Sequence, residues 1–455
     1  MSNPLEFARE NQDRYLKELM DFLRIPSVST QPEHKNDVAS AAAWLATKMT
    51  AAGLENVHVI PTANHPLVYA DWLHAGFDKP TVLIYGHYDV QPVEPFELWE
   101  TPPFEPTLKD DYVYARGSAD DKGQAYIHVK AVEAYLSTDG RLPVNVKFIV
   151  EGEEECGGAS LTAFIAANAE MLAADVALIS DSHMLTPQLP ALVYGLRGMS
   201  YLYVDITGAA HDLHSGGYGG GVNNPINVIS HIIAKLKDED GRILIPGFYD
   251  DVRPLAAEER ALLAQLPIDD ATILQETGAP ALWGEPEYTI VERLGARPTL
   301  DVNGIIGGYT GPGAKTVLPA SVHAKISMRL VPNQDPDTIT HLFTRYVQSI
   351  TPSSVSVTIT PEHSAYPWLA DYNHPAIKAV KLAYGKVFEQ EPVFLRGGGS
   401  IPVVSDFQTH LGITSALMGF GLPDDRLHAP NERFYLPNFY RGIETSIHFM
   451  RLYAG

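Results

Sequence analysis

The sequence predicts an α/β protein in which a mostly parallel sheet is flanked by helices and a smaller α+β domain is inserted. Three observations support this. The chain has 455 residues, more than one core usually accommodates. Short β-rich runs alternate with helical stretches up to Tyr194, and this texture returns from Pro367 onward. We therefore expect one domain of residues 1–195 and 362–455, and a smaller domain of residues 196–361 inserted into it.

The elements of the first domain follow from hydrophobic spacing. Apolar residues from Leu5 to Leu23 recur at helical intervals, which predicts one amphipathic helix that ends before Pro26. A second helix is expected from about Asn36 to Gly53. The strands predicted after it have the sequences LVYADW, TVLIYG, VNVKFIV and DVALIS, with helical stretches such as GQAYIHVKAVEAYL between them. Strands that alternate with helices indicate a largely parallel sheet.

The inserted domain has a different pattern. Alternating runs, MSYLYVDITG, SVHAKISMRLV and SVSVTIT, surround the helical stretch NPINVISHIIAKL. Alternation of apolar and polar residues is typical of strands with one buried face. The chain then returns to the first domain with a helix, PAIKAVKLAYGKVF, a strand, TSALMGF, and a terminal amphipathic helix.

Composition excludes several functional classes. Apolar residues make up 45% and charged residues 19%, as in ordinary globular proteins. The formal charge of −22 would repel a phosphate backbone, so we expect no nucleic-acid partner. The same acidic excess is a common solubility device and alone identifies no metal site.

Cysteine usage and the N-terminus bear on location. The chain has a single cysteine, Cys156, which excludes an intramolecular disulfide and a cysteine-rich zinc site. The first residues lack the apolar core of a signal peptide, and no stretch approaches the ~20 apolar residues of a membrane span. We expect a cytoplasmic protein with no membrane association.

Candidate metal ligands follow predicted strands. His87 comes directly after TVLIYG, and Asp89 follows two residues later, at the strand end where α/β folds place their ligands. A histidine there can bind a metal while an aspartate holds its other ring nitrogen. A role in stabilising a surface loop is the alternative for this pair.

Two acidic segments extend the pattern. RGSADDKG places Asp120 and Asp121 before a predicted helix; Asp120 is the better ligand candidate, because Asp121 is equally explained as an N-cap. The run EGEEECGG, which contains Glu154 and Glu155, follows a strand. Its negative charges would repel one another unless cations neutralised them, or the run is a solvated loop.

Two further positions complete the set. Asp181 follows the strand DVALIS, and His428 lies in a loop bounded by glycine and proline. Histidine and carboxylate ligands without thiolates suit zinc, manganese or cobalt.

The motifs, in order and spacing, resemble a known family over essentially the whole chain. They are GHYDVQP, RGSADDKG, EGEEECGG, the Ser-Asp after DVALI, DLHSGGYGG, KTVLP, SMRLVPN, GGGSIP and HAPNE. The family is that of the co-catalytic zinc metallopeptidases, which includes carnosinase, cytosolic non-specific dipeptidase, succinyl-diaminopimelate desuccinylase and aminoacylase. GHYDVQP, DLHSG and SMRLVPN resemble the dipeptidase and carnosinase branch most.

The resemblance implies a role for each matching residue of the first domain. It implies that His87 and Asp181 hold one metal, that Glu155 and His428 hold the other, and that Asp120 bridges both. Glu154 would be the general base. Asp89 would orient His87, and the Asp120–Asp121 peptide bond would be cis. Two divalent ions per subunit are implied, with zinc expected and manganese or cobalt as alternatives.

The resemblance also implies that residues 1–195 and 362–455 form the catalytic, metal-binding domain, and that residues 196–361 form an inserted lid or dimerisation domain. His214 would reach into the partner subunit of a homodimer and stabilise the oxyanion, against the alternative of an ordinary loop histidine. Arg329 would bind a substrate carboxylate, against the alternative of a surface ion pair. Ser400 and Thr316 would complete that recognition, with Asn303 as a weaker candidate.

The expected function is hydrolysis of the amide bond of dipeptides or small peptides with a free C-terminal carboxylate. An N-acyl-amino-acid amidohydrolase is the alternative with the same centre. A non-catalytic, metal-stabilised binding protein is the alternative of another class; Glu154 argues against it, because a structural metal site needs no spare base.

Overall fold

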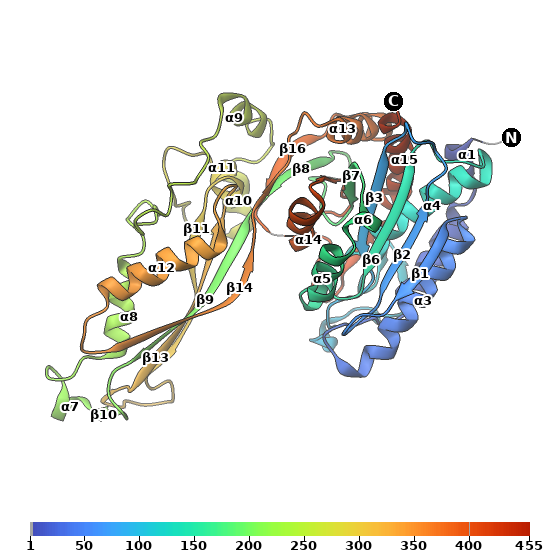
Figure 1. The fold of residues 1–455 in the computed structure, drawn as a ribbon. Helices are drawn as coiled ribbons and strands as arrows, with labels where there is room; N and C mark the ends of the chain where they lie inside the picture. The colour runs from blue at the N-terminus through green and yellow to red at the C-terminus, as the bar shows by residue number, and fades with distance from the viewer. Residues whose placement is uncertain (1–2, 400) are drawn as a thin grey trace. The chain divides into compact units, whose positions relative to one another are not determined.

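A computed structural model of the chain describes residues 3–399 and 401–455 (Figure 1). It divides into two compact units. Unit 1 contains residues 1–194, 370–394 and 403–455, and unit 2 contains residues 195–369 and 395–402. The sequence interpretation assigned 362–369 and 395–402 to the first domain, whereas their contacts place them in unit 2. The expected α/β fold with a mostly parallel sheet is confirmed.

Unit 1 is built around a six-stranded sheet of order β1-β2-β6-β3-β7-β17, whose last four strands run parallel. Its strands are β1 (Glu55–Ile60), β2 (Leu67–Trp72), β3 (Thr81–His87), β6 (Asn145–Glu151), β7 (Val176–Ile179) and β17 (Thr414–Leu417). A second sheet contains β4 (Thr107–Lys109), β5 (Tyr112–Tyr114) and β18 (Arg433–Tyr435). The boundary between the units falls inside β8 (Ala191–Leu196) and β16 (Val393–Gly397).

The helices of unit 1 lie on both faces of the large sheet. The longer ones are α1 (Pro4–Glu10), α2 (Gln12–Leu23), α3 (Lys35–Ala51), α4 (Lys122–Thr138), α5 (Ala159–Ala167), α13 (Pro375–Phe388) and α15 (Leu436–Tyr453). The short turns are η1 (Pro32–His34), η2 (Phe96–Leu98), η3 (Glu154–Cys156), α6 (Ala169–Leu172), α14 (Pro402–Asp406) and η4 (Phe407–Leu411).

Neighbouring residues of β3 show how both faces are covered. A Cβ at Gly86 would lie 2.6 Å from the Cβ of Ala125, so α4 approaches one face very closely. The next side chain along, Tyr85, points to the other face and packs edge-on against Phe407 of η4 at 6.0 Å. The central strands are buried along their length, as expected for a sheet covered on both sides.

The N-terminal segment departs from the expectation of one helix. The structure has two, α1 and α2, separated at Asn11. The side-chain amide of Asn11 donates a hydrogen bond to the carbonyl of Phe7 at 2.8 Å. Asparagine competes with helical backbone bonding in this way, and a pattern of apolar residues does not show it.

Unit 2 is an α+β unit around a four-stranded antiparallel sheet of order β11-β13-β9-β14. Its strands are β9 (Gly198–Thr207), β11 (Thr299–Gly307), β13 (Ser321–Leu330) and β14 (Ser356–Ala365), with the short β10 (Leu213–His214), β12 (Val317–Leu318) and β15 (Trp368–Leu369). Its helices are α7 (Ser215–Tyr218), α8 (Pro225–Ala234), α9 (Ala257–Leu263), α10 (Asp270–Thr277), α11 (Ile290–Gly295) and α12 (Pro336–Ile350).

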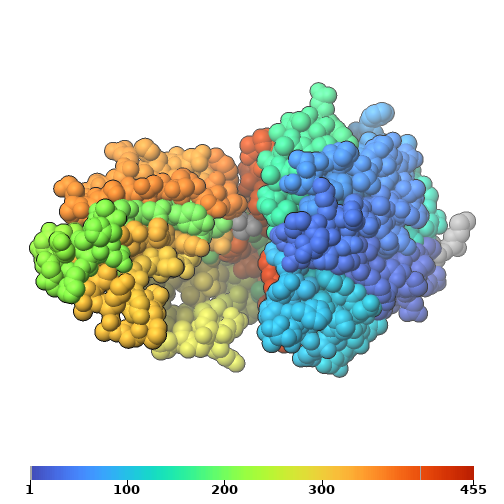
Figure 2. Space-filling view, turned by 90° about the horizontal axis from the view of Figure 1, so that it is seen from below, coloured from blue at the N-terminus to red at the C-terminus, as the bar shows by residue number. Residues whose placement is uncertain are grey.

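The core of unit 2 lies on one face of this sheet. Buried side chains alternate along β9 and β13 and pack against α8 and α12, including Val204, Ile326, Ile229 and Phe343. In Figure 2 the early segment of unit 2 (green) lies beside the later one (orange), in agreement with the pairing of β9 with β14. No helix among the described residues is long and apolar enough to cross a membrane.

Candidate metal centre and substrate-binding residues

The expected ligands meet at the carboxyl ends of the parallel strands of unit 1. His87 is the last residue of β3, opposite Glu151 of β6, and Asp181 lies two residues beyond the end of β7. Two groups of side chains have ligand atoms that all lie within 4.8 Å of one another. The first group is His87, Asp120 and Asp181, and the second is Asp120, Glu155 and His428.

Asp120 belongs to both groups through different oxygens. Its Oδ1 lies 3.0 Å from Nε2 of His87, and its Oδ2 lies 3.0 Å from Nε2 of His428. Oε2 of Glu155 lies 3.4 Å from the same nitrogen of His428. One carboxylate thus faces a histidine on each side, which is the arrangement that a bridging ligand requires. The Asp120–Asp121 peptide bond is cis, as the resemblance implied.

The other nitrogen of His87 is occupied by Asp89. Nδ1 of His87 lies 3.2 Å from the backbone oxygen and 3.4 Å from Oδ1 of Asp89. With Nδ1 donating to Asp89, a neutral His87 would turn the lone pair of Nε2 toward the carboxylate of Asp120. A cation between the two atoms removes that repulsion, so the donor set fits a metal ion.

The pKa values of the carboxyl groups at this candidate centre reflect the negative charge gathered there. Burial raises the pKa of Glu155 to about 8 and that of Asp181 to about 7, and in each case the charge of Asp120 raises it further. Burial also raises the pKa of Glu154, with a further rise from Asp120. Burial alone would raise the pKa of Asp120, but hydrogen bonds with His428 and His87 hold it below its ordinary value. Carboxylates crowded together and buried need cations to remain ionised.

Asp121 does not act as the N-cap that the sequence offered as an alternative. It precedes α4, but its side chain forms no capping hydrogen bond. Its Oδ2 instead accepts from the backbone N–H of His87 at 3.2 Å. Asp121 therefore fixes the end of β3 beside the candidate metal centre.

The EGEEECGG run is not a solvated loop. Glu151 and Glu153 are 2% and 1% exposed. Glu151 accepts from the Tyr85 hydroxyl at 2.7 Å, and Glu153 accepts from the backbone N–H of His65 at 2.9 Å. Two of the four glutamates are thus held by hydrogen bonds, and Glu154 and Glu155 remain for chemistry.

Sequence reasoning missed several residues that hold the ligands. Nε2 of Gln91 donates to Oε2 of Glu155 at 2.6 Å. Glu432 accepts from the backbone N–H of Asp120 at 3.2 Å. Gln91 lies in the motif GHYDVQP and Glu432 in the motif HAPNE. Membership of these motifs is the only sequence signal for either residue.

The candidate residues of unit 2 form two sets. His214 and Thr316 lie together, because β10 pairs with β12 and the N–H of Ser215 donates to the carbonyl of Thr316 at 3.0 Å. His214 is exposed, precedes α7 and accepts from the N–H of Gly216 at 2.9 Å through Nδ1. That bond leaves its Nε2 to face solvent or a ligand.

Arg329 lies on β13 and forms no ion pair within the residues that the structure describes. Sequence reasoning missed its neighbour Arg197. Burial lowers the pKa of Arg197 to about 10, and the positive charge of Arg329 contributes. Two adjacent guanidinium groups are suited to an anion. Ser400 lies outside the described residues.

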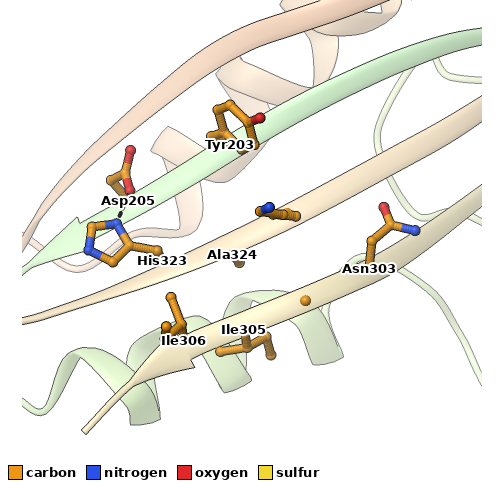
Figure 3. A pocket seen from close by; sticks show the side chains of 9 residues that line it. Tyr203, Asp205, Asn303, Ile305, Ile306, His323 and Ala324 are labelled. Atoms are coloured by element: carbon orange, nitrogen blue, oxygen red, sulfur yellow. Dashed lines mark hydrogen bonds and ion pairs between the residues drawn. The ribbon is translucent and has the colours of Figure 1, made fainter. Parts of the chain in front are cut away.

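Asn303 lies in a register irregularity of β11 and lines a cavity of about 440 Å³ on the sheet of unit 2 (Figure 3). Tyr203 and Lys325 also line it, as does His323, which is hydrogen-bonded to Asp205. A bulge re-aims the side chain that it carries. None of the ligand residues of unit 1 lines this cavity.

Comparison with known proteins places the chain in a family. Residues 83–452 match the model of peptidase family M20/M25/M40. The chain belongs to this family. The Cys-Gly metallodipeptidase dug1 of Schizosaccharomyces pombe is 34% identical over 454 residues, covering 96% of this chain and 95% of that protein. Human Beta-Ala-His dipeptidase is 30% identical over 451 residues, covering 95% and 89%.

A solved structure gives the same result. The M20 family metallo-carboxypeptidase Sso-CP2 of Sulfolobus solfataricus matches with a TM-score of 0.86 and 34% identity, covering 97% of this chain and 99% of that one. The resemblance to the dipeptidase and carnosinase branch is confirmed, and the peptidase is a metal-dependent hydrolytic enzyme. The alternative of a non-catalytic binding protein is thereby wrong.

Proposed function

We propose that the enzyme is a two-metal dipeptidase that anchors the free C-terminal carboxylate of its substrate. The observation that carries this is the sharing of Asp120 between two ligand groups, one oxygen toward His87 and the other toward His428. The proposed ligands are His87 and Asp181 for one ion and Glu155 and His428 for the other. Zinc is the proposed metal, with manganese and cobalt as the alternatives that the same donors accept.

Each candidate site residue of unit 1 has a proposed part in the reaction. When bound, the two metals supply Lewis acidity at the scissile carbonyl and at the attacking water. Glu154 takes the proton from that water and returns it to the leaving amine; its raised pKa suits it to both transfers. Asp89 keeps His87 in the tautomer whose Nε2 is free to ligate.

The carboxylate anchor is proposed on unit 2. Arg329 forms a bidentate pair with the terminal carboxylate, and the neighbouring charge of Arg197 strengthens the attraction. Thr316, Ser400 and Asn303 are proposed to add hydrogen bonds. A substrate without that carboxylate would leave the guanidinium of Arg329 without its anion.

The enzyme is also proposed to act as a homodimer through unit 2, in the cytoplasm. Among the residues that the structure describes, β11 is an edge strand with one unpaired side, and it exposes Ile305 and Ile306 at 52% and 68% (Figure 3). Exposed apolar edges of this kind are normally covered by another chain. In the dimer, His214 of one subunit would stabilise the oxyanion at the partner's site.

A substrate panel tests the function. Metal-free enzyme is reconstituted with Zn²⁺, Mn²⁺ or Co²⁺ and assayed on Cys-Gly, β-Ala-His, the same dipeptides with amidated C-termini, and N-acetyl amino acids. Turnover of free dipeptides with loss on amidation is the expected result. Turnover of N-acetyl amino acids alone would make the enzyme a deacylase.

The anchor is tested separately. Arg329→Met should raise KM for free dipeptides and narrow the difference in kcat/KM between free and amidated dipeptides, because only the free ones carry the anionic group. Arg345→Met, which removes an exposed arginine of α12 in the same unit, is the matched control and should leave KM unchanged. Equal KM values for both variants would refute the anchor.

A further inference from the structure

Glu432 is a buried carboxylate with four hydrogen bonds and no exposed surface. Its Oε1 accepts from the backbone N–H of Ala119 at 3.1 Å and of Asp120 at 3.2 Å. Its Oε2 accepts from the backbone N–H of Gly117 at 3.0 Å and from Nη1 of Arg116 at 2.8 Å. A carboxylate offers about four lone-pair sites, so its capacity is fully used on the loop that carries Asp120.

That loop, residues 116–121, has no helix or strand to hold it. Gln124 fixes its carbonyl side, because Nε2 of Gln124 donates to the carbonyl of Ala119 at 2.8 Å. Oε1 of Gln124 in turn accepts from the N–H of Phe420 at 2.7 Å. Glu432 holds the N–H side, so the backbone that presents Asp120 is fixed from both sides by buried groups.

Glu432 also belongs to the segment that carries the other histidine of the centre. His428 lies four residues earlier and has a left-handed φ of 58°, which is uncommon outside glycine. Asn431 anchors that segment by accepting from the N–H of Glu100 at 2.7 Å and donating to the carbonyl of Leu98 at 2.9 Å. A single side chain therefore ties the segment of His428 to the loop of Asp120.

We propose that Glu432 is a positioning residue of the metal centre, which sets the distance between Asp120 and His428 without touching a metal. This inference rests on the proposed two-metal function. The competing explanation is that Glu432 only balances the charge of Arg116, whose side chain is 1% exposed. The two explanations differ in what happens when both charges are removed together.

Glu432→Gln keeps the shape but leaves one accepting oxygen, and its amide group would face backbone N–H groups that also donate. The metal-free variant should bind Co²⁺ about 10- to 100-fold more weakly in calorimetric titration, the usual effect of losing a partner that orients ligands. The visible absorption of bound Co²⁺ should also change, because it reports ligand geometry rather than stability.

The double variant Glu432→Gln/Arg116→Met distinguishes positioning of the loop from charge balance. It also keeps the test possible if the single variant does not fold. Removing both charges relieves the buried imbalance, so the thermal midpoint should recover toward wild type. If Glu432 positions the loop, weak Co²⁺ binding and the altered spectrum persist. Recovery of wild-type affinity and spectrum would overturn the proposal in favour of charge balance.

A matched control excludes a general effect of removing a buried carboxylate. Glu285 pairs with Arg297 through both oxygens at 2.6 Å within unit 2. Glu285→Gln should lower the thermal midpoint while Co²⁺ affinity and spectrum stay at wild-type values; an equal loss of affinity would count against the proposal. A wild-type protein that fails to bind two Co²⁺ per chain would instead overturn the proposed function, and this inference with it.

Discussion

The backbone N–H of Glu155 donates a hydrogen bond to Oδ2 of Asp89 at 3.0 Å. The same aspartate contacts the ring of His87 through its backbone oxygen and Oδ1. Because His87 belongs to one ligand group and Glu155 to the other, Asp89 links the two halves of the candidate centre. Oδ2 of Asp89 is hydrogen-bonded, whereas its buried Oδ1 only approaches the ring of His87 at 3.4 Å.

Asp89→Asn should therefore weaken metal binding in at least one of the two groups. The amide has one accepting oxygen, so either the His87 ring or the N–H of Glu155 loses its partner. We expect a fall of about 10-fold or more in affinity, measured as metal content after dialysis against a graded chelator. Retention of both metals at wild-type affinity would show that Asp89 does not hold the candidate ligands in place.

Glu154→Gln should lower turnover without lowering metal content. It removes the proposed proton acceptor and no proposed ligand, so metal content should stay at two ions per chain while kcat falls by about 10²- to 10⁴-fold. The neighbouring Glu153→Gln is the control, because that carboxylate is occupied by the N–H of His65 and should affect stability more than kcat. Wild-type kcat in Glu154→Gln would remove the proposed base.

The placement of the ligands could be predicted because it depends on local sequence. His87 and Asp181 follow strands that are parallel neighbours, and parallel strands end at the same edge of a sheet. The periodicity of each strand was enough to find that edge. The pairing of ligands into two groups that share Asp120 came from the resemblance and is matched by the distances.

The residues that hold the ligands could not be predicted, because their contacts are long-range. Glu432 lies 312 positions from the N–H of Asp120 that it accepts from, and Gln91 lies 64 positions from Glu155. Apart from the motifs in which they lie, nothing in the sequence distinguishes these carboxyl and amide groups from solvated ones. The role of Asp121 could not be predicted for the same reason: its position before α4 is also that of a cap, but its hydrogen-bond partner is on β3.

Hybrid dimers test the proposed role of His214. His214→Ala and Asp120→Ala should each be nearly inactive, one lacking the oxyanion donor and the other the bridging ligand. If His214 acts in the partner's site, each hybrid dimer has one complete site. Random mixing of subunits should then restore about a quarter of wild-type activity, since half of the dimers are hybrids.

The control for this experiment mixes Asp120→Ala with Glu155→Ala. Both substitutions affect the same ligand set, so no hybrid contains a complete site and no activity should return. Subunit exchange is verified by mass spectrometry of differently tagged chains. Exchange without recovery in the His214→Ala mixture would show that His214 does not act across the dimer.

Glu18 of α2 is expected to make stability depend on pH through a buried lysine. Its Oε2 accepts from Nζ of Lys130 at 2.6 Å and from the Tyr126 hydroxyl at 2.8 Å, and the Lys130 side chain is 2% exposed. Burial acts to raise the pKa of Glu18, but the hydrogen bond and charge of Lys130 lower it to about 2. The folded-state pKa lies below the ordinary value of 4.5, so the stabilisation is present above pH 4.5 and is lost as pH falls toward 2.

Glu18→Gln should therefore destabilise the fold by about 2 kcal/mol at pH 7, less than the full cost of stranding a buried charge because Glu133 still pairs with Lys130. Thermal unfolding of both proteins between pH 7 and 3 should show the difference narrowing below pH 4.5, because the Glu18 carboxylate of the unfolded wild-type chain becomes protonated there while that of the folded chain stays ionised. Asp21→Asn, which breaks exposed pairs on the same helix with Lys17 and Arg24, should cost under about 0.5 kcal/mol. A Glu18→Gln difference that stays constant over this range would show that the carboxylate's charge does not stabilise unit 1.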